Sequence, residues 1–228
     1  MLKPRKKQVV EDFDQHLANH LNAVKDTCRA EDCPIYAFER GHTFEFDDHT
    51  MTNPDIPIPP QRDAEKEARR RHAMQSSGVL LKDYDHSALD LISEVAAKRL
   101  NCPIGLVGML GDNHYHAIGK YQFDLPDKEI LTAESCCVYT TYAERPMIVK
   151  NPQHDVRFAQ MGLFRDRGIK FYAGFPVCAP DGTVLATLCA IDVEPHDNIG
   201  TKEYATMQML SELAAKLILP KDETEESM

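Results

Sequence analysis

The sequence has no excess of positive charge, since 26 lysines and arginines are outnumbered by 36 aspartates and glutamates and the formal net charge is −10 over 228 residues. Binding to a nucleic-acid backbone requires a basic face, so this balance argues against a nucleic-acid partner. No apolar run approaches the roughly 20 residues that a membrane helix needs. The basic segment 3–7 is not followed by an apolar stretch, so it does not have the form of a secretory signal. These absences predict a cytoplasmic protein without a membrane anchor.

The cysteines also lack a pattern. There are seven of them, and no Cys-x-x-Cys spacing typical of structural zinc sites occurs. Cys102, Cys178 and Cys189 fall in apolar, strand-like segments, where a free cysteine behaves as a small core residue. We therefore expect reduced thiols, no metal and no other cofactor.

Composition divides the chain into three parts. Apolar residues recur at helical spacing over 10–24, and four prolines between 53 and 60 exclude both helix and central strand. We expect residues 1–60 to be an N-terminal extension with one amphipathic helix and a proline-rich linker. Residues 61–219 are expected to form the folded domain, and residues 220–228 an acidic, disordered tail.

Within the folded part, the apolar patterns predict alternating helices and strands. Strands joined by tight turns pair antiparallel, and helices then cover the sheet, so we expect an α+β domain with a central antiparallel sheet of about six strands. The helix at 61–76 has few apolar positions, which favours a solvated helix or a narrow packing seam. Thr201 is the expected cap of the last helix. The expected helices are 61–76, 85–100, 134–144 and 201–219, and the expected strands are 103–110, 114–120, 147–149, 171–177 and 183–191.

The most informative stretch is the segment from Phe171 to Asp192. It contains an aromatic and apolar run, then Pro180-Asp181-Gly182, then a β-branched and apolar run. Proline presets φ for a turn and glycine accepts positive φ, so this segment predicts a hairpin of two core strands.

The end of this hairpin, Thr-Leu-Cys-x-x-Asp at 187–192, resembles the signature of GAF domains. The resemblance extends over 62–218: Ser135-Cys136-Cys137 stands where one subgroup has Ser-Phe-Cys-Ala-His, and the segments 146–149 and 155–159 are similar to that subgroup's Pro-Leu-Val-Val and Asp-x-Arg-Phe motifs. It implies a PAS-related fold and a small sensory or ligand-binding signalling module rather than an enzyme.

The resemblance also implies where a ligand would enter: between the sheet and the loops at 111–137 and 151–170. Around that place the sequence departs from the subgroup, with Tyr139 where histidine is usual and His116 where tryptophan or phenylalanine is common. The ligand of a relative is therefore not assumed. The candidate ligand-binding residues are His116, Cys137, Tyr139, Arg157, Phe175, Cys178 and Asp192.

Cys136 and Cys137 are the candidates for chemistry. A thiolate near a helix N-terminus has a lowered pKa and becomes nucleophilic. Some GAF relatives reduce free methionine sulfoxide with cysteines, and others attach a bilin through one. The alternative is a pair of buried structural cysteines, since adjacent cysteines rarely form a good disulfide with each other.

Two further groups of side chains are weaker candidates. His114 and His116, with His154 and Asp155, could approach a metal site, but spacing places no further ligand, and a solvent-facing histidine pair is the simpler expectation. The cations at 157, 165, 167 and 170 could bind a carboxylate or phosphate. Alternatively, Arg157 pairs with Asp155 or Asp192 and fixes the loop.

Three functions therefore remain open at this point. The leading one is a sensor that binds an unidentified small molecule and acts on a signalling protein in trans, or through a homodimer. The second is a thiol-based reductase of the free methionine sulfoxide reductase type. The third is a ligand-free GAF scaffold for protein–protein contact, which a filled interior would favour.

Overall fold

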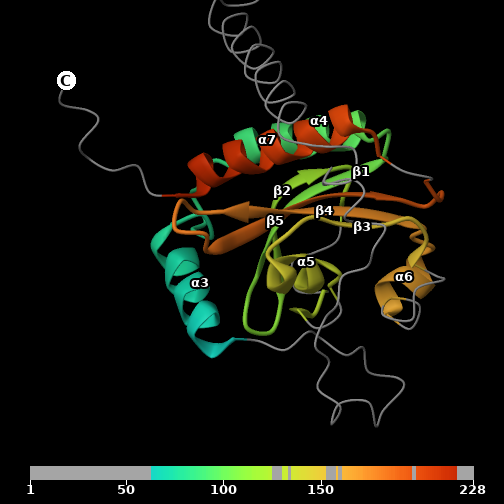
Figure 1. Cartoon of the computed structure of the whole chain (residues 1–228). Coiled ribbons are helices and arrows are strands. Elements are labelled where there is room, and N and C mark those ends of the chain that lie inside the picture. The colour runs from blue at the N-terminus through green and yellow to red at the C-terminus, as the bar shows by residue number, and fades with distance from the viewer. Residues whose placement is uncertain are drawn as a thin grey trace, which may run out of the picture.

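The computed structural model describes residues 63–124, 130–132, 135–152, 158, 161–196 and 199–219. The predicted N-terminal helix, the proline-rich linker and the acidic tail lie outside these residues. Within them, strands and helices alternate in an α+β arrangement around one antiparallel sheet (Figure 1). No helix in the described part of the chain combines the length and apolar character that crossing a bilayer would require.

The sheet has five strands in the described residues, close to the number of about six that the sequence predicts. Their order is β2-β1-β5-β4-β3, and every neighbouring pair is antiparallel. All nine residues of the central strand β5 are buried, as expected for an apolar strand covered on both faces. The strands are β1 (Ile104–Leu110), β2 (Tyr115–Tyr121), β3 (Met147–Val149), β4 (Phe171–Cys178) and β5 (Val184–Asp192).

The hairpin of β4 and β5 is confirmed. Its register runs from Phe171 opposite Asp192 to Cys178 opposite Val184. Gly182 has a φ of +85°, a conformation that glycine adopts at no steric cost. The Asp181 carboxylate accepts a hydrogen bond of 2.9 Å from the backbone N–H of Thr183, which is the local side-chain bond that favours aspartate in turns.

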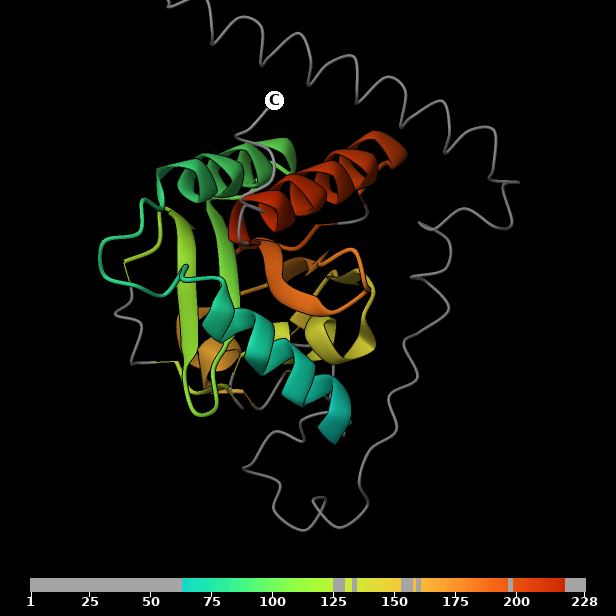
Figure 2. The same cartoon turned by 90° about the vertical axis from the view of Figure 1, so that its left-hand side faces the viewer.

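Helices cover both faces of the sheet (Figures 1 and 2). The long helices α4 (Ser87–Arg99) and α7 (Thr201–Ile218) pack on one face, and the short helices α5 (Cys137–Ala143) and α6 (Gly162–Arg167) lie on the other. Because strand side chains alternate between faces, the core divides into two apolar clusters, one on each side of the sheet.

The helix α3 (Ala64–Ser76) lies beside the turn of the β4–β5 hairpin. It packs through a narrow face, one of the two alternatives that its composition left open, and this face is partly polar. Glu67 and Arg70 are buried and form an ion pair, and the Arg70 guanidinium also donates to the carbonyl of Leu110. Tyr142 of α5 donates a hydrogen bond of 3.2 Å to Glu67. The composition of this helix is compatible with a narrow packing face but does not predict the ion pair within it.

Two local expectations are wrong. Thr201 does not cap α7, because the N-cap position belongs to Gly200 and makes no side-chain capping bond. The segment before β4 is not a plain loop, because it contains the single-turn helix α6, which ends at Gly168 with a φ of +67°. Glycine at such a position permits the left-handed residue that terminates a helix.

Candidate functional site

A cavity of about 370 Å³ opens on the face of the sheet that carries α5 and α6. It lies between the start of β1, the end of β5 and the helices α5 and α6. Its walls are mainly apolar, with a few polar groups at the rim. The lining residues are Ile104, Leu106, Tyr115, Gln122, Phe123, Asp124, Ile130, Ser135, Cys136, Cys137, Leu163, Arg167, Ile169, Cys189, Ile191 and Val193.

Three cysteines, Cys136, Cys137 and Cys189, form part of the cavity wall. All are buried and free. The Cys137 sulfur is at the centre of a hydrogen-bonded group: the hydroxyl of Tyr172 donates to it at 3.5 Å, and its own thiol faces the hydroxyl of Tyr115 at 3.8 Å and the sulfur of Cys189 at 3.9 Å. Cys137 is also the first residue of α5, and its backbone N–H donates to the Ser135 hydroxyl.

This arrangement favours a negative charge on Cys137. Hydrogen bonds from the thiols of Cys136 and Cys189 lower its pKa well below the ordinary thiol value, against the opposing effect of burial. Burial and the charge of Cys137 raise the pKa of Tyr115 and of Tyr172. Cys137 is therefore the member of this group that ionises most readily, whereas Tyr115 and Tyr172 hold their protons more tightly than usual.

Two glycines make room for the two tyrosines. A Cβ on Gly108 would lie 1.8 Å from the Tyr115 hydroxyl oxygen, and a Cβ on Gly174 would lie 2.1 Å from that of Tyr172. Neither contact is sterically allowed, so only glycine leaves space for each phenol at this depth. The Thr140 and Tyr172 hydroxyls, 3.0 Å apart, further fix the second phenol. The site is thus built from two glycine–tyrosine pairs on β1–β2 and β4.

The predicted pair Cys136–Cys137 is brought to this cavity, whereas other predicted residues lie elsewhere. Tyr139 is fully buried on the same face and packs edge-on against Phe158, with ring centroids 4.9 Å apart. Phe175 lies on the opposite face and packs against Tyr204 of α7 at 5.1 Å. These side chains belong to the packed core on either side of the sheet, and their part in ligand binding stays a prediction.

Cys178 and His116 lie outside the cavity lining. Cys178 is half-buried at the far end of β4, where burial and the nearby Glu144 carboxylate raise its pKa. His116 is on β2, and its ring lies against Gly111, since a Cβ on that glycine would be 2.6 Å from Nε2. Their part in ligand binding also stays a prediction. His154 and Asp155, the other proposed partners of the histidine pair, are outside the described residues.

Of the predicted cations, Arg167 reaches the cavity and Lys170 does not. Lys170 instead forms an ion pair of 3.9 Å with Glu194. Arg157 and the side chain of Arg165 are outside the described part of the chain.

Asp192, another predicted ligand residue, points away from the cavity, although its neighbours Ile191 and Val193 line it. Its carboxylate accepts from the backbone N–H of Glu194 at 3.0 Å and lies 2.8 Å from Nε2 of His196.

Sequence reasoning missed Tyr115, Tyr172 and Cys189 as members of the site. A signal was present for two of them: in the predicted hairpin, Tyr172 and Cys189 lie on neighbouring strands, with Gly174 opposite Cys189. A phenol and a thiol on adjacent apolar strands, next to a glycine, indicate a polar pocket inside the core. The approach of Tyr115 depends on the long-range pairing of β1 with β5, which no local pattern specifies.

The comparisons with known proteins agree with this architecture. The sequence model of the GAF domain matches residues 86–218, so the chain belongs to the GAF domain family. This family assignment confirms the resemblance found in the sequence.

Among curated proteins, the chain is 24% identical over 150 residues to a cyclic di-GMP phosphodiesterase of Pseudomonas aeruginosa. The match includes 65% of the chain but only 25% of that relative, so the chain spans about a quarter of its length.

Two solved structures are similar to this chain at low identity, and the first of them has the same fold. A domain of a protein from Sinorhizobium meliloti, assigned to the two-component sensor histidine kinases, is 10% identical with a TM-score of 0.51, and the match covers 64% of this chain and all of that one. The GAF domain of an Acinetobacter phosphoenolpyruvate-protein phosphotransferase is 16% identical with a TM-score of 0.48, over 69% of this chain and 94% of that one.

Proposed function

We propose that this protein is a sensory GAF module that binds a small molecule in the cavity between β1, β5, α5 and α6. The observation that carries the proposal is the cavity itself. Its volume of about 370 Å³ falls within the range of roughly 300–1,000 Å³ that small-molecule sites occupy. A ligand-free scaffold would be expected to fill this space with side chains.

The residues that line the cavity indicate the chemistry of its ligand. Leu106, Ile169 and Ile191 offer an apolar wall, which suits a hydrophobic body. Arg167 is the cation at the rim and suits an anionic or strongly polar substituent. We therefore propose a compact, largely apolar ligand with one acidic group, held with its apolar end toward the cysteines.

The output of such a module requires a partner, in trans or as a second copy of the chain. Leu91 on α4 and Leu213 on α7 expose 59% and 41% of their surface. Both helices pack on the face of the sheet opposite the cavity. A shift of the sheet on ligand binding would be transmitted to them through the packed core, so we propose this helical layer as the output surface.

The binding proposal is tested with 8-anilino-1-naphthalenesulfonate, a probe with an apolar body and one sulfonate. Fluorescence titration of the full chain should show one saturable site. Leu163→Trp places a larger ring on the cavity wall and should abolish the saturable signal. Leu213→Trp adds the same ring on the opposite face and is the matched control. Absence of a saturable site in the folded protein, or equal binding by both variants, would contradict the proposal.

A thiol-based reductase is the second candidate, and the donor-surrounded sulfur of Cys137 favours it. In such a reaction the Cys137 thiolate takes the oxygen of a methionine sulfoxide, so a sulfur–oxygen bond forms on Cys137, the sulfoxide bond breaks and methionine leaves. Cys189, whose sulfur lies 3.9 Å away, then attacks the resulting sulfenic acid. The sulfur–sulfur bond forms and water leaves, and an external dithiol restores both thiols.

One assay distinguishes the reductase function from the sensor function. Free methionine sulfoxide is incubated with the protein and dithiothreitol, and released methionine is measured. Turnover that is lost in Cys137→Ser and retained in Cys178→Ser would support the reductase. No methionine above the protein-free rate would exclude it and leave the binding proposal intact.

A further inference from the structure

Three side chains of ligand type meet at the other face of the sheet, where β1 begins and β5 ends. Cys102 comes two residues before β1, Asp192 is the last residue of β5, and His196 follows four residues later. The thiol sulfur, a carboxylate oxygen and a ring nitrogen all lie within 4.8 Å of one another. In the described part of the chain, this is the one such group of three metal-ligand residues.

The antiparallel register explains why residues so distant in sequence meet. β1 pairs with β5 from Ile104 opposite Ile191, so the chain just before β1 runs beside the chain that leaves β5. Strand alternation then separates this group from the cavity, because Ile191 and Val193 face the cavity while Asp192 does not. The group is therefore independent of the binding site proposed above.

The donor atoms are oriented by contacts outside the group. One carboxylate oxygen of Asp192 accepts the N–H of Glu194 at 3.0 Å, which leaves the other oxygen facing His196 Nε2 at 2.8 Å. The His196 ring is stacked on Phe171, with centroids 4.1 Å apart and an interplanar angle of 13°. Metal-binding side chains are commonly held by outer contacts of this kind.

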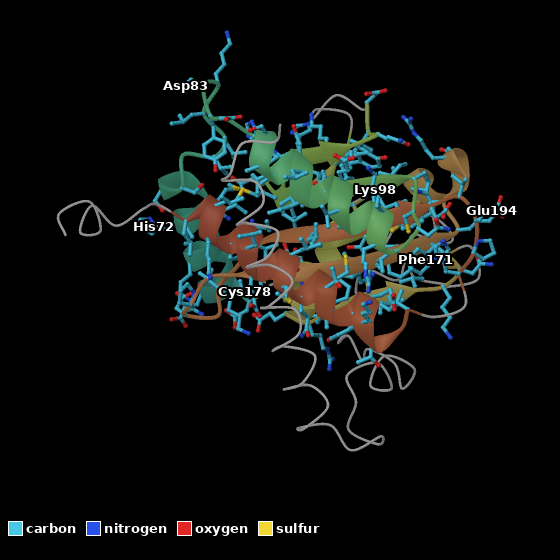
Figure 3. All side chains as sticks on the ribbon, turned by 90° about the horizontal axis from the view of Figure 1, so that it is seen from above. His72, Asp83, Lys98, Phe171, Cys178 and Glu194 are labelled. Atoms are coloured by element: carbon cyan, nitrogen blue, oxygen red, sulfur yellow. The ribbon has the colours of Figure 1, made fainter. Side chains whose placement is uncertain are left out.

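The three side chains are more buried than aspartate and histidine side chains at a protein surface usually are. Cys102 and Asp192 are 6% and 8% exposed, and the His196 side chain is 19% exposed. His196 thus forms the side of the group that water can reach. Figure 3, seen from above, shows Phe171 and Glu194 at one end of the sheet and Cys178 at the other, so the group lies at the end of β4 away from Cys178.

We propose that Cys102, Asp192 and His196 bind a zinc ion. A thiolate, a carboxylate and a neutral imidazole together carry two negative charges, which a divalent cation balances. The mixture of sulfur, nitrogen and oxygen donors suits zinc, whereas magnesium and calcium prefer oxygen alone and copper(I) prefers sulfur. Zinc bonds of about 2.0–2.3 Å require the three donors, which lie within 4.8 Å of one another, to rearrange around the ion, and the Asp192 oxygen and His196 Nε2, now 2.8 Å apart, to separate slightly. Water completes the fourth, open position.

The ion would connect three parts of the fold. It would hold the chain before β1, the end of β5 and the segment leading into α7, which begins at Thr201. Because binding free energy adds to folding free energy when the unfolded chain lacks the site, zinc is expected to stabilise this end of the sheet.

The test uses the full chain after removal of metal with a chelator. Zinc titration in competition with a chromophoric chelator should give one tight site per chain. Cys102→Ser, Asp192→Asn and His196→Gln should each weaken zinc binding by more than about 10- to 100-fold, since that is the loss when only an outer contact of a metal ligand is removed. Near-UV circular dichroism of each variant shows whether it is folded.

Cobalt(II) provides a readout of thiolate coordination that is available in the wild-type protein itself. The wild-type protein with cobalt should show a thiolate-to-cobalt charge-transfer absorption. This band should disappear in Cys102→Ser and persist in Cys178→Ser and Cys189→Ser. No zinc bound at one equivalent, no thiolate band in the wild type, or a band that follows Cys189 instead of Cys102 would overturn the proposal.

Discussion

The sulfur atoms of Cys137 and Cys189 lie 3.9 Å apart at the wall of the cavity, one on the first turn of α5 and the other on the central strand β5. The contact joins a short helix to the most buried strand of the sheet. With the phenols of Tyr115 and Tyr172, it surrounds one sulfur with neutral hydrogen-bonding groups, of which the Tyr172 hydroxyl donates to it. Such a sulfur is suited to carry a negative charge in an otherwise apolar place.

The reactivity of Cys137 should depend on pH in a distinctive way. Its pKa lies well below the ordinary thiol value because Cys136 and Cys189 donate to it. Modification of Cys137 by methyl methanethiosulfonate should therefore keep its rate as the pH falls from 9 to 7, whereas an ordinary thiol of pKa about 8.5 loses roughly 25-fold of its thiolate over the same range. Peptide mapping by mass spectrometry at each pH measures this rate, with Cys178 as the internal comparison. A Cys137 profile parallel to that of Cys178 would be inconsistent with a stabilised thiolate.

Removal of one phenol hydroxyl should weaken the thiolate. Tyr172→Phe keeps the ring over Gly174 but removes the donor at 3.5 Å from the Cys137 sulfur. We expect the pKa of Cys137 to rise by the equivalent of one charge-assisted hydrogen bond of about 1.5 kcal/mol. Its modification rate should therefore fall by up to about tenfold at acidic pH, below the pKa of Cys137, and should change little at pH 7. Tyr204→Phe, on the opposite face, should leave the rate unchanged. An equal rate at acidic pH in Tyr172→Phe would show that its hydroxyl does not act on this sulfur.

We expect a single substitution in α3 to lower the free energy of unfolding substantially. Arg70→Met removes the cation that is paired with the buried carboxylate of Glu67 and the donor to the Leu110 carbonyl. Breaking a buried ion pair from one side costs about 3–5 kcal/mol. Urea unfolding should show this loss, whereas Arg69→Ala, from the exposed pair with Glu65, should change the unfolding free energy by less than about 1 kcal/mol. Similar values for the two variants would mean that the Glu67–Arg70 pair is not buried in solution.

The parts of the fold that the sequence predicts are those with local physical signals. The hairpin of β4 and β5 follows from a Pro-Asp-Gly turn between two apolar runs, and α4 and α7 follow from apolar residues at helical spacing. The short helix α6 has no such signal: six residues make too few turns to show a period. Its boundary glycine, Gly168, is the one local indication of a helix end.

The candidate site is less predictable because it depends on long-range contacts. The resemblance to GAF domains points to Cys136 and Cys137, and the structure places both at the cavity. The approach of Tyr115 from β2 depends on which strands are neighbours and in which register, and the sequence of β2 alone does not contain that information. The buried position of Glu67 and Arg70 is hidden for the same reason, since a charged helix is usually solvated.

The most direct test measures whether a ligand bound in the cavity contacts Cys137 and protects it from modification. The modification rate of Cys137 by methyl methanethiosulfonate is compared with and without saturating 8-anilino-1-naphthalenesulfonate, and the rate of Cys178 is followed in the same samples. We expect the bound probe to protect Cys137 strongly and to leave the modification rate of Cys178 unchanged. Saturable binding of the probe with no protection of Cys137 would place the ligand elsewhere and contradict this expectation.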